Sequence, residues 1–197
     1  MWKSKITRFY TLLVCQSKQI FFPNQVSIQN FPVTKLYKEG SVHYILKYSD
    51  SRVRELVHQI KFSKNKKCFE YIGKELSQHL PDNSDVILLP VPQTKSRMRE
   101  RGYDVTHTLV REIQKHISIQ DGHGILKNER KDVQSKIKDR DKRISSVSGT
   151  INLTKDVRGK KFIILDDVFT TGSTLREAKK VIEENGGEVI YSICIAH

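Results

Sequence analysis

Cysteine is scarce in this sequence, and its few copies are not arranged in pairs. The 197 residues include three cysteines, Cys15, Cys68 and Cys194, and no two of them form a C-x-x-C pair. Zinc ribbons and dithiol redox motifs both depend on such pairs, so the sequence supports neither. We therefore expect these thiols to be buried or incidental.

Long apolar runs are also missing. Apolar residues make up 37% of the chain, but no run approaches the roughly 20 residues that a membrane-spanning helix needs. The basic start of the chain, residues 1–18, lacks the long apolar core and the small-residue cleavage site of a secretory signal. We therefore expect a cytoplasmic protein of one domain, with a small appendage and no membrane insertion.

Acidic residues are fewer than basic residues in this sequence. Lys and Arg number 35 against 22 Asp and Glu, which gives a formal net charge of +13. Such an excess favours a polyanionic partner, either a nucleic acid or a heavily phosphorylated small molecule. Simple solubility is the alternative explanation.

Alternating strand and helix patterns predict an α/β fold. Short apolar runs at residues 85–92, 160–168 and 188–196 are typical of buried parallel strands. Amphipathic patterns predict helices at about 51–60, 67–80, 105–117 and 174–184. The alternation predicts a mostly parallel twisted sheet with helices on both faces, whose ligands bind beyond the carboxyl ends of the strands.

The chain divides into an irregular start and a regular remainder. Residues 1–40 hold short apolar pieces broken by proline, asparagine and glycine, which predicts an N-terminal arm or hood. Residues 41–197 form the predicted main domain. Inside it, the polar stretch at about 120–148 predicts a mobile loop, since long loops within a compact domain are usually functional or disordered.

Two adjacent acids precede a turn that suits an anion. In "FIILDDVFTTGSTL" the predicted strand carries Asp166 and Asp167 to its carboxyl end, with side chains toward opposite faces. The following turn leads into a helix N-terminus, whose N–H groups and dipole attract anions, and Thr174 and Glu177 have capping-box spacing. The loop would hold a phosphate while the acids accept from sugar hydroxyls. The loop residues are Thr170, Thr171, Gly172, Ser173 and Thr174.

Three other interpretations compete for this stretch. A Walker-type loop needs a lysine after the glycine, and none is present. A phosphatase with an aspartyl nucleophile also places carboxylates at a strand end, but too little chain follows for the later motifs of that fold. A plain capped turn would leave two adjacent acids at a buried strand end, at a cost in desolvation.

The pattern "IILDDVFTTGST" resembles the phosphoribosyl pyrophosphate (PRPP) signature of type I phosphoribosyltransferases. Further stretches narrow the resemblance to the ComF family of competence-associated phosphoribosyltransferase-like proteins, and together they cover about residues 44–197. These stretches are "YSDSRVRELVHQIKFSKNKK", "LLPVPQTKSRMRERGYDVTHTL" and "DDVFTTGSTLREAKKVIEENGG". The resemblance implies a type I phosphoribosyltransferase fold.

The resemblance also implies roles for particular residues. The paired acids of type I enzymes contact the ribose hydroxyls, which carries to Asp166 and Asp167, and the 5′-phosphate loop carries to residues 170–174. Mg²⁺ is implied because it bridges the pyrophosphate and ribose oxygens; the two acids are its candidate protein ligands. The pyrophosphate loop matches residues 91–101, with candidates Lys95, Arg97, Arg99 and Arg101. An exposed basic loop is the alternative there.

Several positions depart from the family pattern. ComF-like proteins commonly begin with a four-cysteine zinc module, whereas this chain has only Cys15 in that region, so no zinc is expected. In "RGYDV", Asp104 and Val105 replace the usual amides. Thr170 stands where purine-specific relatives often place an acidic general base, so no catalytic residue can be named.

Two functions from different classes follow. One is a PRPP-binding protein of natural competence that handles incoming single-stranded DNA during transformation, with a helicase partner implied by the resemblance. The other is an active phosphoribosyltransferase that transfers phosphoribosyl to a nucleobase or amine; a PRPP-sensing regulator is a third possibility. Candidates for DNA phosphate contacts are Lys131, Lys136, Lys138, Arg140, Lys142 and Arg143. Phe62, Phe69 and Tyr103 are either base-stacking or core residues.

Overall fold

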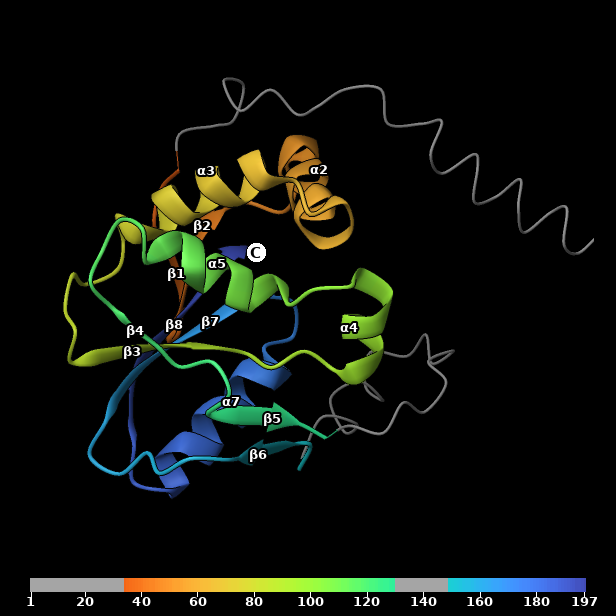
Figure 1. The fold of residues 1–197 in the computed structure, drawn as a ribbon. Coiled ribbons are helices and arrows are strands. Elements are labelled where there is room, and N and C mark those ends of the chain that lie inside the picture. Colours follow the sequence, from red (N-terminus) through yellow and green to blue (C-terminus); the bar gives the residue numbers. More distant parts are fainter. Residues whose placement is uncertain (1–33, 130–148) are drawn as a thin grey trace, which may run out of the picture. The chain divides into compact units, whose positions relative to one another are not determined.

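The computed structural model describes residues 34–129 and 149–197. Six strands form one sheet in the order β1-β2-β8-β7-β3-β4 (Figure 1). Within this six-stranded sheet, β1 and β2 pair antiparallel and the other neighbouring strands pair parallel. The strands are β1 (Tyr37–Glu39), β2 (Val42–Leu46), β3 (Val86–Pro90), β4 (Gln120–Asp121), β7 (Lys161–Val168) and β8 (Glu188–Ala196). The predicted mostly parallel sheet is confirmed.

Helices cover both faces of this sheet, as predicted. Figure 1 shows α2, α3 and α5 on one face, and α7 with the hairpin of β5 and β6 on the other. A π-helical turn, η2, continues α2. The bounds are α2 (Ser51–His58), η2 (Gln59–Ser63), α3 (Lys66–Ser77), α5 (Val105–Ile113) and α7 (Ser173–Glu184). The hairpin strands are β5 (Leu126–Asn128) and β6 (Ile151–Leu153).

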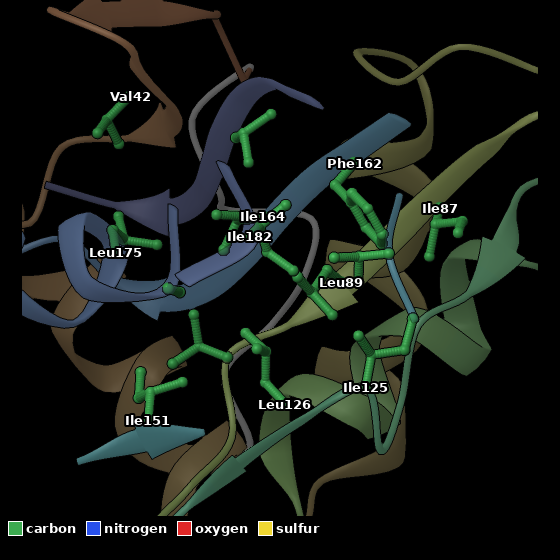
Figure 2. Packing of buried hydrophobic residues seen from close by; sticks show 14 of the residues in the cluster. Val42, Ile87, Leu89, Ile125, Leu126, Ile151, Phe162, Ile164, Leu175 and Ile182 are labelled. Atoms are coloured by element: carbon green, nitrogen blue, oxygen red, sulfur yellow. The ribbon is translucent and has the colours of Figure 1, made fainter. Parts of the chain in front are cut away.

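Strand β7 lies between β8 and β3 and sorts its side chains to two faces. Phe162 and Ile164 pack with Leu175 and Ile182 of α7 in the core shown in Figure 2. Because side chains alternate along a strand, Ile163 and Leu165, both fully buried, occupy the other face. The same alternation carries into the polar end of β7. It directs Asp166 and Asp167 to opposite faces.

One predicted loop is a helix. The expectation of a loop after β3 is wrong for residues 95–101, which form α4 (Lys95–Arg101). The side chain of Thr94 caps its start by accepting from the N–H of Arg97, and Gly102, at φ 74°, ends it in the left-handed conformation. Lysine, arginine, methionine and glutamate between these caps are good helix formers.

Two other local expectations are corrected. The stretch predicted as a mobile loop begins with β4 and β5, and its remainder, 130–148, lies outside the described residues. The expected capping box of α7 does not form, because Gly172 is the N-cap and makes no side-chain cap. Glu177 instead accepts from the backbone N–H groups of Thr150 (2.5 Å) and Ile151 (3.0 Å), which ties β6 to α7.

Two of the three thiols can be placed. Cys68 and Cys194 are free and buried, as expected, whereas Cys15 lies outside the described residues. Within residues 34–129 and 149–197, no helix is both long enough and apolar enough to cross a membrane.

Helices α3 and α5 meet at Gly73. A Cβ on this residue would lie 2.5 Å from the Cβ of Glu112 and 3.1 Å from its carbonyl carbon. We expect Gly73→Ala to destabilise the protein by about 1–3 kcal/mol, because overpacking this contact outweighs the helix propensity of alanine. Chemical denaturation measures the change, with Lys74→Ala on the exposed side of α3 as the control. A Gly73→Ala protein as stable as the control would contradict the close packing.

Candidate functional site

Polar groups gather where β3 and β7 end side by side. Pro90 pairs with Leu165, and the N–H of Val91 donates to the carbonyl of Leu165 over 2.9 Å. The next residues on β7 are the two acids, and the chain after β3 continues into α4. This is the carboxyl edge of the parallel strands, where such sheets bind ligands.

Asp167 is held by two cations from different elements. Its Oδ2 lies 3.1 Å from the Nζ of Lys61 on η2 and 3.6 Å from the Nη1 of Arg101 at the end of α4. Its Oδ1 accepts from the N–H of Val168 over 2.7 Å. The side chain is only 14% exposed. Both oxygens of Asp167 therefore already have donors.

Arg101 is a buried guanidinium with donor capacity to spare. Its side chain is 8% exposed. Besides Asp167, its Nη1 reaches the Oε1 of Gln93 at 3.3 Å, and its guanidinium carbon lies 5.5 Å from the centre of the Phe62 ring. Its buried Nε finds no hydrogen-bond partner within the described part of the chain. Since buried donors are nearly always satisfied, this group is suited to an anion that completes the site.

Asp166 has a different environment. Its Oδ1 accepts from the N–H of Asp167 over 2.8 Å, and among the described residues no hydrogen bond reaches its Oδ2. Burial, and then the negative charge of Asp167, raise the pKa of Asp166 to about 7, against the smaller opposing effects of that N–H, Lys61 and Arg97. Asp166 can therefore accept from a ligand hydroxyl through an oxygen that the protein leaves open.

Helix α4 separates its four basic residues into two pairs. Residues four apart share a helix face, so Arg97 lies with Arg101 and Lys95 with Arg99. Arg101 contacts Asp167 and the charge of Arg97 acts on Asp166. Lys95 instead adds to the lowering of the pKa of Glu129, after the larger effects of Lys127 and Asn152. The structure thus brings Arg97 and Arg101 to the acids, and Lys95 and Arg99 stand on another face.

The loop after β7 leaves a helix N-terminus open. The N-cap Gly172 adopts φ 66° and has no side chain to cap α7, and the N–H of Ser173 donates to the hydroxyl of Thr171 over 3.4 Å. The hydroxyls of Thr171 and Ser173 lie 3.0 Å apart, Thr174 is half-buried, and Thr170 is exposed. The first N–H groups of a helix have no intrahelical partner, so they and the hydroxyls can together surround an anion.

Phe169 fixes the start of this loop. Its N–H donates to the carbonyl of Ala196, and its own carbonyl lies 2.9 Å from the Nδ1 of His197. A Cβ on Gly172 would lie 2.5 Å from the Phe169 ring. Glycine is therefore required at this position both for its left-handed backbone and for the close approach of the ring.

Sequence analysis missed Lys61, which comes from a segment far from the acids in the chain. No local motif marked it. Of the aromatic candidates, Phe69 and Tyr103 are buried, so the core interpretation is confirmed for both, while Phe62 is 50% exposed. The six candidates from Lys131 to Arg143 lie outside the described residues. Within the described part, no group of three or more His, Cys, Asp or Glu could hold a metal.

Residues 101–197 match the family of phosphoribosyl transferase domains. An orotate phosphoribosyltransferase of Methanopyrus kandleri is 62% identical over 40 residues, 20% of this chain and 22% of that protein. The transcriptional regulator GfcR of Methanocella arvoryzae is 54% identical over 35 residues, 18% of this chain and 17% of that protein. The DNA utilization protein YhgH of Escherichia coli O157:H7 is 25% identical over 152 residues, 71% of this chain and 65% of that protein. The chain thus spans less than two thirds of the length of each of these relatives.

Solved structures give weaker likenesses. An adenine phosphoribosyltransferase of Leishmania tarentolae superposes with a TM-score of 0.45 at 11% identity, covering 82% of this chain and 94% of that chain. Because this score is low, the fold assignment depends on the family match and on the sheet itself. The C-terminal half of the chain is a phosphoribosyltransferase domain in an α/β, mostly parallel sheet. The predicted likeness to the ComF family is confirmed by the long alignment with YhgH.

The raised pKa of Asp166 predicts that its carboxyl weakens the fold as pH rises. Between the ordinary value of 3.8 and about 7, the folded protein keeps a proton that the unfolded chain has lost. The free energy of unfolding should therefore fall over this range, and Asp166→Asn should flatten that fall. Denaturation titrations between about pH 5 and 8 measure it, and parallel curves for the two proteins would contradict the assignment.

Proposed function

We propose that this protein binds PRPP together with Mg²⁺. One edge of the sheet brings together the helix N-terminus after Gly172, the oxygen of Asp166 that has no donor among the described residues, and the buried guanidinium of Arg101. These groups match the three parts of PRPP: a 5′-phosphate, ribose hydroxyls and a pyrophosphate. A ligand with an anionic group at only one end would leave either the N-terminus of α7 or the guanidinium of Arg101 without an anion.

Magnesium fits this site as an ion carried by its ligand. The described residues offer Asp166 but no set of three acidic or imidazole groups, so the protein alone provides no cage. Mg²⁺ keeps several waters and commonly binds through one or two carboxylates plus substrate phosphates. We infer that Mg²⁺ is held mainly by PRPP oxygens, with Asp166 as the nearest protein oxygen.

We also propose that the protein handles incoming single-stranded DNA during natural transformation, with a helicase as partner. Two observations favour this over a purely metabolic role. A DNA utilization protein aligns over 152 residues of this chain, and Phe62 offers a half-exposed ring on the lysine-rich segment "KFSKNKK". Aromatic rings among basic side chains are typical of single-strand binding. The candidates between Lys131 and Arg143 stay part of this proposal.

Phosphoribosyl transfer to a nucleobase or amine is the alternative function. An orotate phosphoribosyltransferase is among the relatives, and the site would stabilise the departing pyrophosphate. Thr170, at the position of an acidic base in purine-specific relatives, presents an exposed hydroxyl. The competence role is favoured because no described acid or base stands at that position.

PRPP binding should depend on Mg²⁺ and on the loop after β7. We expect Gly172→Ala and Asp166→Asn each to weaken PRPP by about tenfold or more, since hydrogen bonds to charged groups contribute about 1.5–3 kcal/mol. Calorimetry measures the affinities. Gly159→Ala is the matched control, because Gly159 also has positive φ but meets no atom within 4 Å. Unaltered affinity in both site variants would refute the site.

Single-stranded DNA binding should depend on Phe62 and on salt. We expect Phe62→Ala to weaken binding of an oligonucleotide about tenfold, because stacking contributes about 1–3 kcal/mol per base. Ile190→Ala, which removes another exposed apolar side chain, should change little. Fluorescence anisotropy at several salt concentrations measures both effects. Binding that ignores salt, or that weakens equally in the two variants, would reject the DNA proposal.

A further inference from the structure

The two acids at the end of β7 differ in what they have left to offer a ligand. The carboxylate of Asp167 accepts from Val168 through one oxygen and meets both cations through the other. Asp166 has one oxygen bonded to the N–H of Asp167 and one oxygen without a donor among the described residues. Since the acids point to opposite faces of the strand, a single ribose ring need not reach both.

The cations around Asp167 have more donors than this carboxylate can use. Lys61 has three N–H donors and Arg101 has five, while Asp167 presents to them only its Oδ2. Two cations face the single carboxylate of Asp167, and the neighbouring Asp166, whose pKa burial and Asp167 raise to about 7, adds less than a full negative charge, so the cluster keeps an excess of positive charge. The Nε of Arg101 adds a buried donor that has no hydrogen-bond partner among residues 34–129 and 149–197. The cluster therefore holds its cations in place and still attracts an anion.

The backbone that carries Lys61 is fixed by the domain core. The hydroxyl of Tyr103 donates to the carbonyl of Ile60 and accepts from the N–H of Lys64. Lys64 ends η2 in the left-handed conformation at φ 47°. The side chain of Lys61 is 19% exposed, so its ammonium group faces the edge of the sheet from a fixed turn.

We propose that the two acids perform different tasks, a proposal that rests on the PRPP function above. Asp166 alone receives the ribose hydroxyls, and Asp167 is a positioning residue that holds Lys61 and Arg101 for the pyrophosphate. Lys61, which lies outside the matched domain of residues 101–197, then becomes a pyrophosphate contact. This proposal differs from the expectation that both acids bind ribose.

Two half-ligands separate the tasks, because inorganic pyrophosphate has no ribose and ribose 5-phosphate has no pyrophosphate. If Asp167 only bound ribose, removing its negative charge would leave pyrophosphate affinity unchanged or raise it. If Asp167 positions the two cations, Asp167→Asn should weaken pyrophosphate several-fold despite the lost negative charge. The sign of this change decides between the two roles.

The experiment uses the full chain with Mg²⁺ and measures calorimetric affinities for PRPP and both half-ligands. We expect Lys61→Met to weaken the binding of pyrophosphate about tenfold. The conservative variant Lys61→Arg should keep much of the wild-type affinity. Asp167→Asn should weaken the binding of pyrophosphate more than the binding of ribose 5-phosphate. Asp166→Asn should weaken the binding of ribose 5-phosphate more than that of pyrophosphate. Lys74→Met on α3 controls for the loss of a lysine charge. Asp167→Asn should reduce the affinity for pyrophosphate clearly less in the Lys61→Met variant than in the wild-type protein.

The possible failures are distinguishable. If wild-type protein binds neither PRPP nor pyrophosphate, the proposed function falls and this inference falls with it. If PRPP binds, but Asp167→Asn leaves the affinity for pyrophosphate unchanged and lowers the affinity for ribose 5-phosphate, the division of tasks is overturned and the PRPP function stands. Equal losses for Lys61→Met and Lys74→Met would remove Lys61 from the site.

Discussion

The carboxylate of Asp167 joins three elements that lie far apart in the sequence. It stands at the end of β7 and meets Lys61 from η2 and Arg101 from α4. A carboxylate this poorly exposed is costly unless it is paired, and Lys61 and Arg101 supply that pairing. The pairing in turn fixes two cations at the sheet edge, and the rest of the proposed site is arranged around them.

The second acid is stabilised less. Asp166 shares the same edge but receives one hydrogen bond from the described part of the chain, and its raised pKa follows from burial beside a like charge. Groups with perturbed pKa values cluster at functional sites, because a binding site needs polar atoms whose partners are not all protein atoms. The N-terminus of α7 has the same character, since its N-cap Gly172 has no side chain to accept from the first turn. Both features cost stability in the free protein, and the proposed anionic sugar ligand would offset this cost by supplying the partners.

The sheet and the two acids could be predicted because their signals are local. The apolar run ending in "DD" marks a buried strand, and the small residues after it mark an open helix start. Lys61 could not be found in this way, since its role depends on how η2 sits against β7. Helix α4 was predicted as a loop because its basic residues obscured the caps at Thr94 and Gly102. The capping box failed because Glu177 bonds to the backbone of β6.

Structure also accounts for part of the departure from the family pattern. Asp104 caps α5 by accepting from the N–H of His107 over 3.0 Å, and Val105 is fully buried. An acid and an apolar residue thus serve local stability at this helix start.

A crystal structure of the full chain with PRPP and Mg²⁺ would decide where the ligand binds. We expect the 5′-phosphate on the first N–H groups of α7, the ribose hydroxyls on Asp166, and the pyrophosphate on Lys61 and Arg101 while Asp167 still holds both. A ligand that binds elsewhere, or a ribose that displaces Lys61 from Asp167, would contradict it.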